Sequence, residues 1–333
     1  ATPTATEVVT GLKALINAGT TGVVATGTTT LILNSQIPFT HSESAKLTAV
    51  SVDETLSAGI SRMKALAYFG GIGYTHTPTD GEIEAAGALV NGYRKLLFVG
   101  SSDPTDLESG GLIHTLNGST LKYARGLYYS VAADLYKFVW GYIGRAMSTN
   151  FSGTNTTQTM HLKQIAGCSA DPGIDATVLT AAGAVGADVY VDIAGRPSVF
   201  TSGTNGFFDS MYNLAWIVGA FEVAGFNALA QTSSKIPQTE SGMDYLKLAY
   251  GKIAEQAIAN RYIAPGAWNS PDTFGDPEDF ARNILEVGYF IYSQPVNLQA
   301  QADRAARKAP VVQIAIKESG AIHSSDVIIN VNA

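Results

Sequence analysis

A serine hydrolase, which needs a Ser nucleophile, a His base and an orienting Asp, is the first chemistry to consider for this chain. In a subtilisin-like triad the Asp comes first, then the His and then the Ser, and the three side chains meet within hydrogen-bond reach. Asp192 in the segment DIAG fits the first role, but the next histidine is His323, which has only Ser324 and Ser325 after it. The sequence also contains no G-x-S-x-G turn. We therefore expect no catalytic residues and no enzymatic activity.

Cofactor and metal motifs match equally poorly. The segment FGGIGY at 69–74 lacks the G-x-G-x-x-G spacing of a dinucleotide loop, and we interpret its glycines as the end of a helix. The acidic loop at 264–279 lacks the D-x-[DN]-x-[DN]-G calcium pattern. The histidines are scattered without the spacing of metal ligands: His41, His76, His114, His161 and His323. We expect neither a cofactor nor a metal.

The composition indicates a folded, acidic protein. The 333 residues suffice for roughly two or three domains, and 46% hydrophobic against 15% charged residues excludes intrinsic disorder. A net charge of −7 without a basic stripe argues against a nucleic-acid partner. The longest apolar stretch, 214–230, is interrupted by Glu222 and Asn227, so we expect a buried helix and no membrane partner. The N-terminus does not resemble a secretory signal.

The first two predicted domains are α/β units. Residues 1–75 predict a small subdomain with a helix capped by Thr6, a hairpin over 22–33 and a helix near 54–68. Residues 76–205 predict a sheet domain in which strands alternate with helices. Its strands are expected at 95–99, 121–129 and 189–193, and its helices at 106–116, 135–146 and 176–185. This alternation predicts a mainly parallel sheet covered on both faces, as in doubly wound α/β folds.

Residues 206–333 predict a helix-and-sheet domain, which makes the whole chain a mixed α/β (α+β) protein. Two long helices are expected at 206–230 and 242–260, the second opening with a capping box at Ser241 and Asp244. A strand-like segment follows at 288–292. Residues 311–332 form a predicted β arm with apolar residues at every second position: Val312, Ile314, Ile316, Val327, Ile329 and Val331. Because an isolated hairpin is marginal in water, this arm needs a sheet to join.

A cluster of cations precedes the arm. Arg304, Arg307 and Lys308 share one face if residues 299–308 are helical, and Pro310 would end that helix. Two interpretations stay open. The cations either complement the dipole at a solvated helix end, or they meet acidic groups on a partner.

The C-terminal part of the chain resembles a family of contractile phage tail sheath proteins. Weaker likeness extends back through TMHLKQIAG at 159–167 toward the N-terminus. Sheath proteins of this kind begin with a further N-terminal region that includes a linking arm, and we expect this chain to lack that region. The resemblance is carried by GFFDSMYNLAWI (206–217), KIPQTESGM (235–243), IAPGAW (263–268), ADRAARKAP (302–310) and VVQIAIKESGAIHSSDVIINVN (311–332).

The resemblance implies a structural subunit of the virion tail that is assembled in the bacterial host cytoplasm. Sheath subunits stack as hexameric rings around a tail tube, and their terminal arms add strands to neighbouring subunits. Contraction then drives the tube into the host cell. The implied partners are other sheath subunits, the tail tube protein, the baseplate and the tail terminator, with Arg304, Arg307 and Lys308 as a possible tube contact. Another self-assembling virion or shell protein, or an α/β enzyme with an unrecognised site, remains an alternative.

Overall fold

The computed structural model describes residues 3–20, 22–35, 54–75, 78–118 and 121–325. The chain packs as two units, Ala1–Asp53 and Glu54–Ala333. The first boundary therefore lies at Asp53 and not at the predicted residue 75, because Leu56 and Ile60 of helix α2 (Leu56–Leu66) are buried with side chains of the second unit. The boundary predicted near residue 205 stays a prediction.

The N-terminal unit is a helix beside a hairpin, as predicted. Its elements are α1 (Ala5–Asn17), β1 (Val23–Thr26) and β2 (Ile32–Ser35), and the two strands are antiparallel. Thr4, and not the predicted Thr6, caps α1 in a capping box with Glu7. The Asn17 amide holds the helix on the hairpin, since it donates to the Ala25 carbonyl at 3.0 Å and accepts the Ala25 N–H at 2.7 Å.

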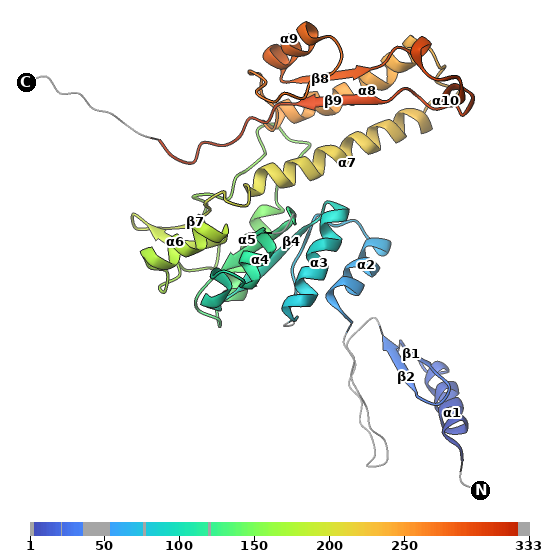
Figure 1. The fold of residues 1–333 in the computed structure, drawn as a ribbon. Helices are drawn as coiled ribbons and strands as arrows, with labels where there is room; N and C mark the ends of the chain where they lie inside the picture. Colours follow the sequence, from blue (N-terminus) through green and yellow to red (C-terminus); the bar gives the residue numbers. More distant parts are fainter. Residues whose placement is uncertain (1–2, 21, 36–53, 76–77, 119–120, 326–333) are drawn as a thin grey trace, which may run out of the picture. The chain divides into compact units, whose positions relative to one another are not determined.

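A five-stranded sheet forms the centre of the second unit (Figure 1). Its order is β3-β4-β5-β6-β7, and the first four strands are parallel while β7 is antiparallel, so the predicted mainly parallel sheet is confirmed. Because the described strands follow chain order, they have no reversal of the kind at which doubly wound folds bind ligands. The strands span Gly71–Ile72 (β3), Leu96–Ser101 (β4), Ala124–Tyr128 (β5), Asp188–Ile193 (β6) and Arg196–Phe200 (β7).

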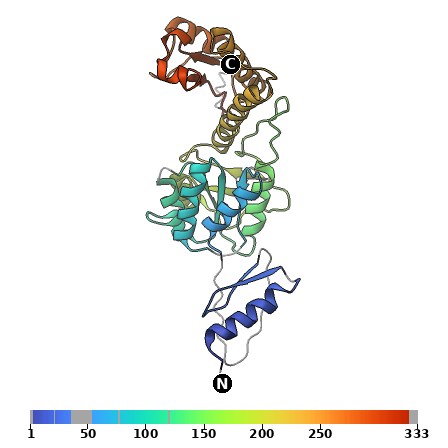
Figure 2. The same ribbon diagram turned by 90° about the vertical axis from the view of Figure 1, so that its right-hand side faces the viewer.

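Helices cover both faces of this sheet (Figure 2). Along β4, Leu96 and Phe98 pack toward α5, whereas Leu97 and Val99 pack toward α3 and α4. The alternation follows from the period of two in a strand. The helices are α3 (Asp80–Tyr93), α4 (Leu112–Gly118), α5 (Leu135–Ala146) and α6 (Ala176–Val185), and a 3₁₀ turn, η1 (Pro104–Leu107), precedes α4.

Two predictions for this domain are wrong. The predicted helix 106–116 is the 3₁₀ turn η1 followed by the short helix α4. The glycines of FGGIGY do not end a helix, because α2 already ends at Leu66 and Gly71 begins the edge strand β3. A Cβ on Gly71 would lie 2.8 Å from the sulfur of Met147 and 2.9 Å from the Phe98 ring. Glycine therefore lets β3 approach the core closely.

The C-terminal part of the second unit has two long helices and a two-stranded antiparallel sheet, β8–β9. Thr239, and not Ser241, caps α8 by accepting the Gly242 N–H. Helix α9, capped by Asp276, was missed in the sequence. The elements are α7 (Phe208–Ala230), α8 (Glu240–Ala259), α9 (Pro277–Val287), β8 (Tyr289–Ser293), η2 (Val296–Leu298), α10 (Gln301–Ala305) and β9 (Val312–Ile316).

Helix α7 is half-buried rather than buried. Ile217 packs with Ala254 and Ala257 of α8, but Phe226 and Leu229 are exposed. Among the described residues it is the one helix long and apolar enough to cross a membrane. Core helices of soluble proteins often have the same length and composition.

Candidate functional site

The first half of the predicted arm is an internal strand of this chain. Val312, Ile314 and Ile316 lie in β9 and are half-buried. Val312 and Ile316 pack on the α7–α8 side, while Ala315 on the opposite face packs with Phe280 of α9. The strand has therefore joined a sheet of its own chain, one of the arrangements expected of an arm that needs a sheet, and its role between subunits stays a prediction. The other predicted arm residues lie outside the described residues: Val327, Ile329 and Val331.

One edge of β9 is open among the described strands. The strand pairs with β8 along its whole length, from Tyr289 opposite Ile316 to Ser293 opposite Val312. The described sheet contains only these two strands, so the second edge of β9 has no described strand beside it. An unpaired edge presents N–H and C=O groups that can bind another strand.

An apolar groove of about 460 Å³ runs beside β9. Residues of α7, α8 and β9 line it, together with charged and amide side chains such as Glu222 and Gln238. Three predicted site residues, Val312, Ile314 and Arg307, meet in its lining. The groove therefore offers a hydrophobic surface where β9 has no described strand partner. Its apolar lining includes Leu229 of α7, Met243 and Leu246 of α8, and Val312 and Ile314 of β9.

The three predicted cations do not share a helix face. Helix α10 ends at Ala305, because the Lys308 N–H donates to the Asp303 carbonyl and the Arg307 N–H to the Arg304 carbonyl, both at 3.0 Å. This is a Schellman motif, with Arg307 (φ 57°) in the left-handed position that usually holds glycine. Arg307 lines the groove, and Lys308 forms an ion pair with Asp303 at 3.2 Å. The turn thus separates side chains that a longer helix would align.

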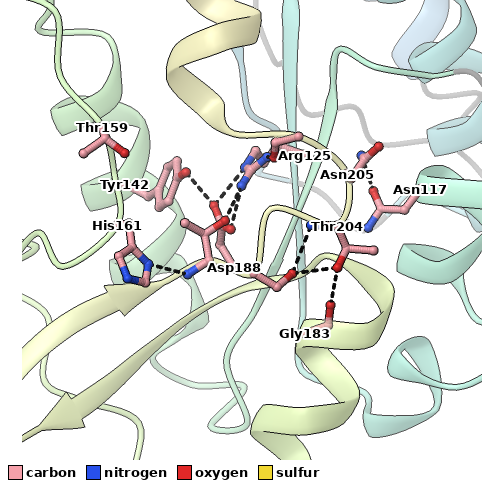
Figure 3. A network of polar contacts seen from close by, with 12 residues as sticks. Asn117, Arg125, Tyr142, Thr159, His161, Gly183, Asp188, Thr204 and Asn205 are labelled. Carbon is pink, nitrogen blue, oxygen red and sulfur yellow. Dashed lines mark hydrogen bonds and ion pairs between the residues drawn. The ribbon is translucent and has the colours of Figure 1, made fainter. Parts of the chain in front are cut away.

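A buried ion pair, which the sequence reasoning missed, lies between β5 and β6 (Figure 3). Arg125 is 2% exposed and Asp188 is 0% exposed. The Tyr142 hydroxyl donates to Asp188 Oδ2 at 2.6 Å. Burial and the Asp188 charge hold the pKa of Tyr142 well above its usual value. Burial opposes the charge of Arg125, but Asp188 outweighs it and raises the pKa of the guanidinium. The sequence did offer one signal of this pair: Arg125 and Asp188 are charged residues in two mainly apolar strands.

The same network fixes the chain that leads into α7. Arg125 donates to the Thr201 hydroxyl and to the Gly206 carbonyl, both at 2.9 Å. Beside it, the Thr204 hydroxyl donates to the Gly183 carbonyl at 2.8 Å (Figure 3). Both carboxylate oxygens of Asp188 accept hydrogen bonds, as expected of a buried structural ion pair. The network therefore joins the five-stranded sheet firmly to the start of α7.

Asp192 and His323, considered as the acid and the base of a hydrolase triad, lie in separate places. Asp192 Oδ1 accepts the Gly195 N–H at 2.7 Å inside the β6–β7 hairpin. Ala194 and Gly195 have positive φ there, as in a type I′ turn. His323 instead contacts Thr159, His161 and Phe207. Among the described residues, no group of three or more His, Cys, Asp or Glu side chains is placed to hold a metal ion.

The C-terminal part of the chain is similar to a known protein family. Residues 208–331 match the family described as E217 tail sheath protein gp31-like, C-terminal domain. The match starts at the first residue of α7 and includes β8, β9 and all of the groove lining. No curated protein matches the chain.

Proposed function

We propose that the chain is a phage tail sheath subunit that polymerises around a tail tube and contracts to drive the tube into the host cell, because residues 208–331 match a tail sheath C-terminal domain. The family match supports a structural role in a phage tail sheath, as a virion component that associates with other sheath subunits. The observation that carries the finer proposal is the open edge of β9 beside the apolar groove.

In this proposal a neighbouring subunit supplies a third strand to the β8–β9 sheet. Residues 327–332 (VIINVN) have the period of a strand with one apolar face. Their backbone would pair with the open edge of β9, and the alternate apolar side chains would enter the groove against Leu229 and Leu246. Burying each such side chain contributes about 2 kcal/mol, so one strand supplies a link of useful strength.

Contraction in this proposal is a rigid-body movement of subunits between two packings in hexameric rings. The hydrogen bonds at Thr201, Thr204 and Gly206 support this, because they fix the start of α7 to the sheet. The energy is stored in assembly, so the subunit needs no cofactor and has no enzymatic activity. Tube, baseplate and tail terminator are the other proposed partners, and assembly takes place in the host cytoplasm.

A matched pair of substitutions tests the groove. Leu229 lines it and is 62% exposed, while Leu285 on α9 is 60% exposed and does not line it. Leu229→Lys should leave thermal unfolding unchanged but abolish tubes in negative-stain images of subunits assembled with tail tube. Leu285→Lys should still give tubes. Tubes with both variants, or with neither, would contradict the proposed link.

The donor strand is tested separately. Removing residues 325–333 should give a folded subunit that no longer assembles, because the strand that enters the groove is lost. Full-length tubes from the truncated chain would show that residues 327–332 are not the link.

A further inference from the structure

His323 lies just before the second half of the predicted arm and packs against the sheet domain of the same chain. Its ring stacks on His161, with the centroids 4.6 Å apart and the planes at 28°. The Phe207 ring meets it edge-on at 4.5 Å. Its Nε2 atom lies 2.9 Å from the Thr159 hydroxyl. Three side chains from two segments distant in sequence thus form a small site that holds residue 323.

The contacts of His161 require a neutral ring. The Thr201 N–H donates to His161 Nδ1 at 3.2 Å, so Nδ1 carries no proton (Figure 3). Protonation would place a second N–H opposite this donor. If His323 were protonated as well, two cations would be stacked face to face. Burial, and then the nearby His323, lower the pKa of His161.

The surrounding charges do not favour a cationic pair. Asp188 raises the pKa of His161, but its carboxylate is already engaged by Arg125, and Lys163 acts in the opposite direction. The cavity beside Thr159 and Ile322 is lined by two acidic and two basic side chains, which balance one another: Asp209, Glu318, Lys163 and Arg261.

A fixed point and a turn precede His323. The Ser319 N–H donates to the Tyr262 carbonyl at 2.9 Å, and the Ser319 hydroxyl donates to the Arg261 carbonyl at 2.6 Å. Gly320 follows with φ 64°, a conformation that glycine adopts without strain. Beyond Gly320, Ile322 is 92% exposed, so the contacts of His323 are the main hold on residues 321–325.

We propose that the His161–His323 stack is a pH-sensitive latch that holds residues 321–325 against the subunit's own sheet domain. Acid releases this segment about Gly320. Because the folded contact disfavours protonated His161, the stabilisation is complete above the ordinary imidazole pKa and is lost as the pH falls below it. The regulatory consequence rests on the proposed function: a latched segment is kept from a neighbour's groove, and protonation makes it available.

Histidine NMR of the full chain tests the latch directly. In the ¹³C-labelled protein, the His161 imidazole should titrate below the ordinary range, and the ring shift that Phe207 imposes on His323 should vanish in the same transition. Within the transition, the ratio of latched to released protein should fall about tenfold per pH unit for each proton taken up. His323→Phe keeps a ring but no charge, so the pKa of His161 should rise toward its usual value.

His114 provides the control. Its Nδ1 accepts the Gly110 N–H at 3.2 Å, the same kind of contact as that of His161. His114→Phe should leave this transition unchanged. A ring shift on His323 that persists after His161 has become protonated would overturn the latch. Failure of the sheath proposal would look different: no tubes at any pH, with the NMR transition still present.

Discussion

The Arg125 guanidinium and the Asp188 carboxylate form a paired contact across β5 and β6, with Nε–Oδ2 at 2.8 Å and Nη2–Oδ1 at 2.7 Å. This two-point geometry fixes the orientation of both groups. Because the guanidinium also binds Thr201 and Gly206, one buried side chain aligns the sheet with the start of α7.

Arg125→Met should destabilise the protein by about 3–5 kcal/mol, because it leaves the Asp188 charge buried without its partner. The double variant with Asp188→Leu should recover part of this loss in urea unfolding. Arg62 pairs with Glu54 at the surface at 2.7 Å, so Arg62→Met should cost no more than about 1 kcal/mol. Equal costs at the two arginines would contradict the structural role of the buried pair.

Alkaline pH should destabilise the protein through Tyr129. Burial, and then the Cys168 thiol and nearby carboxylates, raise the pKa of Tyr129 to about 12 from 10.0. Because the folded state keeps this proton, the stabilisation is complete below pH 10 and is lost as the pH rises from there toward 12. Unfolding free energies across this interval should fall less steeply in Tyr129→Phe. An identical slope in the variant would contradict the raised pKa.

Two glycines of α5 should respond oppositely to alanine. A Cβ on Gly141 would lie 2.3 Å from Cγ2 of buried Ile165, whereas a Cβ on Gly144 meets nothing within 4 Å. Gly144→Ala should stabilise the protein by about 0.5–1 kcal/mol, because alanine is the better helix former. Gly141→Ala should cost about 1–3 kcal/mol through overpacking. Thermal unfolding of the two variants decides this, and a stabilising Gly141→Ala would refute the close contact.

Reversing Arg304 and Arg307 to Glu should leave the fold intact but impair assembly on tail tubes. The control is the same charge reversal at two other exposed cations, Lys122 and Lys252. The neighbouring cations Arg94 and Lys95 would be unsuitable as a control pair, because Arg94 pairs with Glu222 at 2.6 Å and Lys95 lies over the Tyr68 ring.

Reversal of the control pair should reduce tube yield less. Equal losses at the two pairs would leave only the interpretation of a solvated helix end. Because Arg307 lines the groove, the single variants also separate a tube contact through Arg304 from a contact between subunits through Arg307.

Elements with a strong local pattern could be predicted from the sequence. The bounds of α5 and α6 agree with the expected 135–146 and 176–185, because an apolar stripe and caps such as Asp175 are local features. The apolar run of β4 identified a buried central strand for the same reason. The family resemblance likewise holds for residues 208–331.

Features that depend on distant partners could not be predicted. The edge strand β3 has only two residues, and it is a strand because it pairs with β4. Arg125 and Asp188 are 63 residues apart, and neither shows its partner in the local pattern. Arg307 ends a helix in a conformation that favours glycine, so no local residue pattern predicted this turn.

The pairing of β8 with β9 also orders events during synthesis. A nascent chain that extends only to Ser293 contains β8 but not its partner, and the groove still lacks Val312 and Ile314. The surface proposed to receive a neighbour's strand is therefore completed only after residue 316 has left the ribosome. A subunit translated only as far as β8 offers no finished groove to a neighbour's strand.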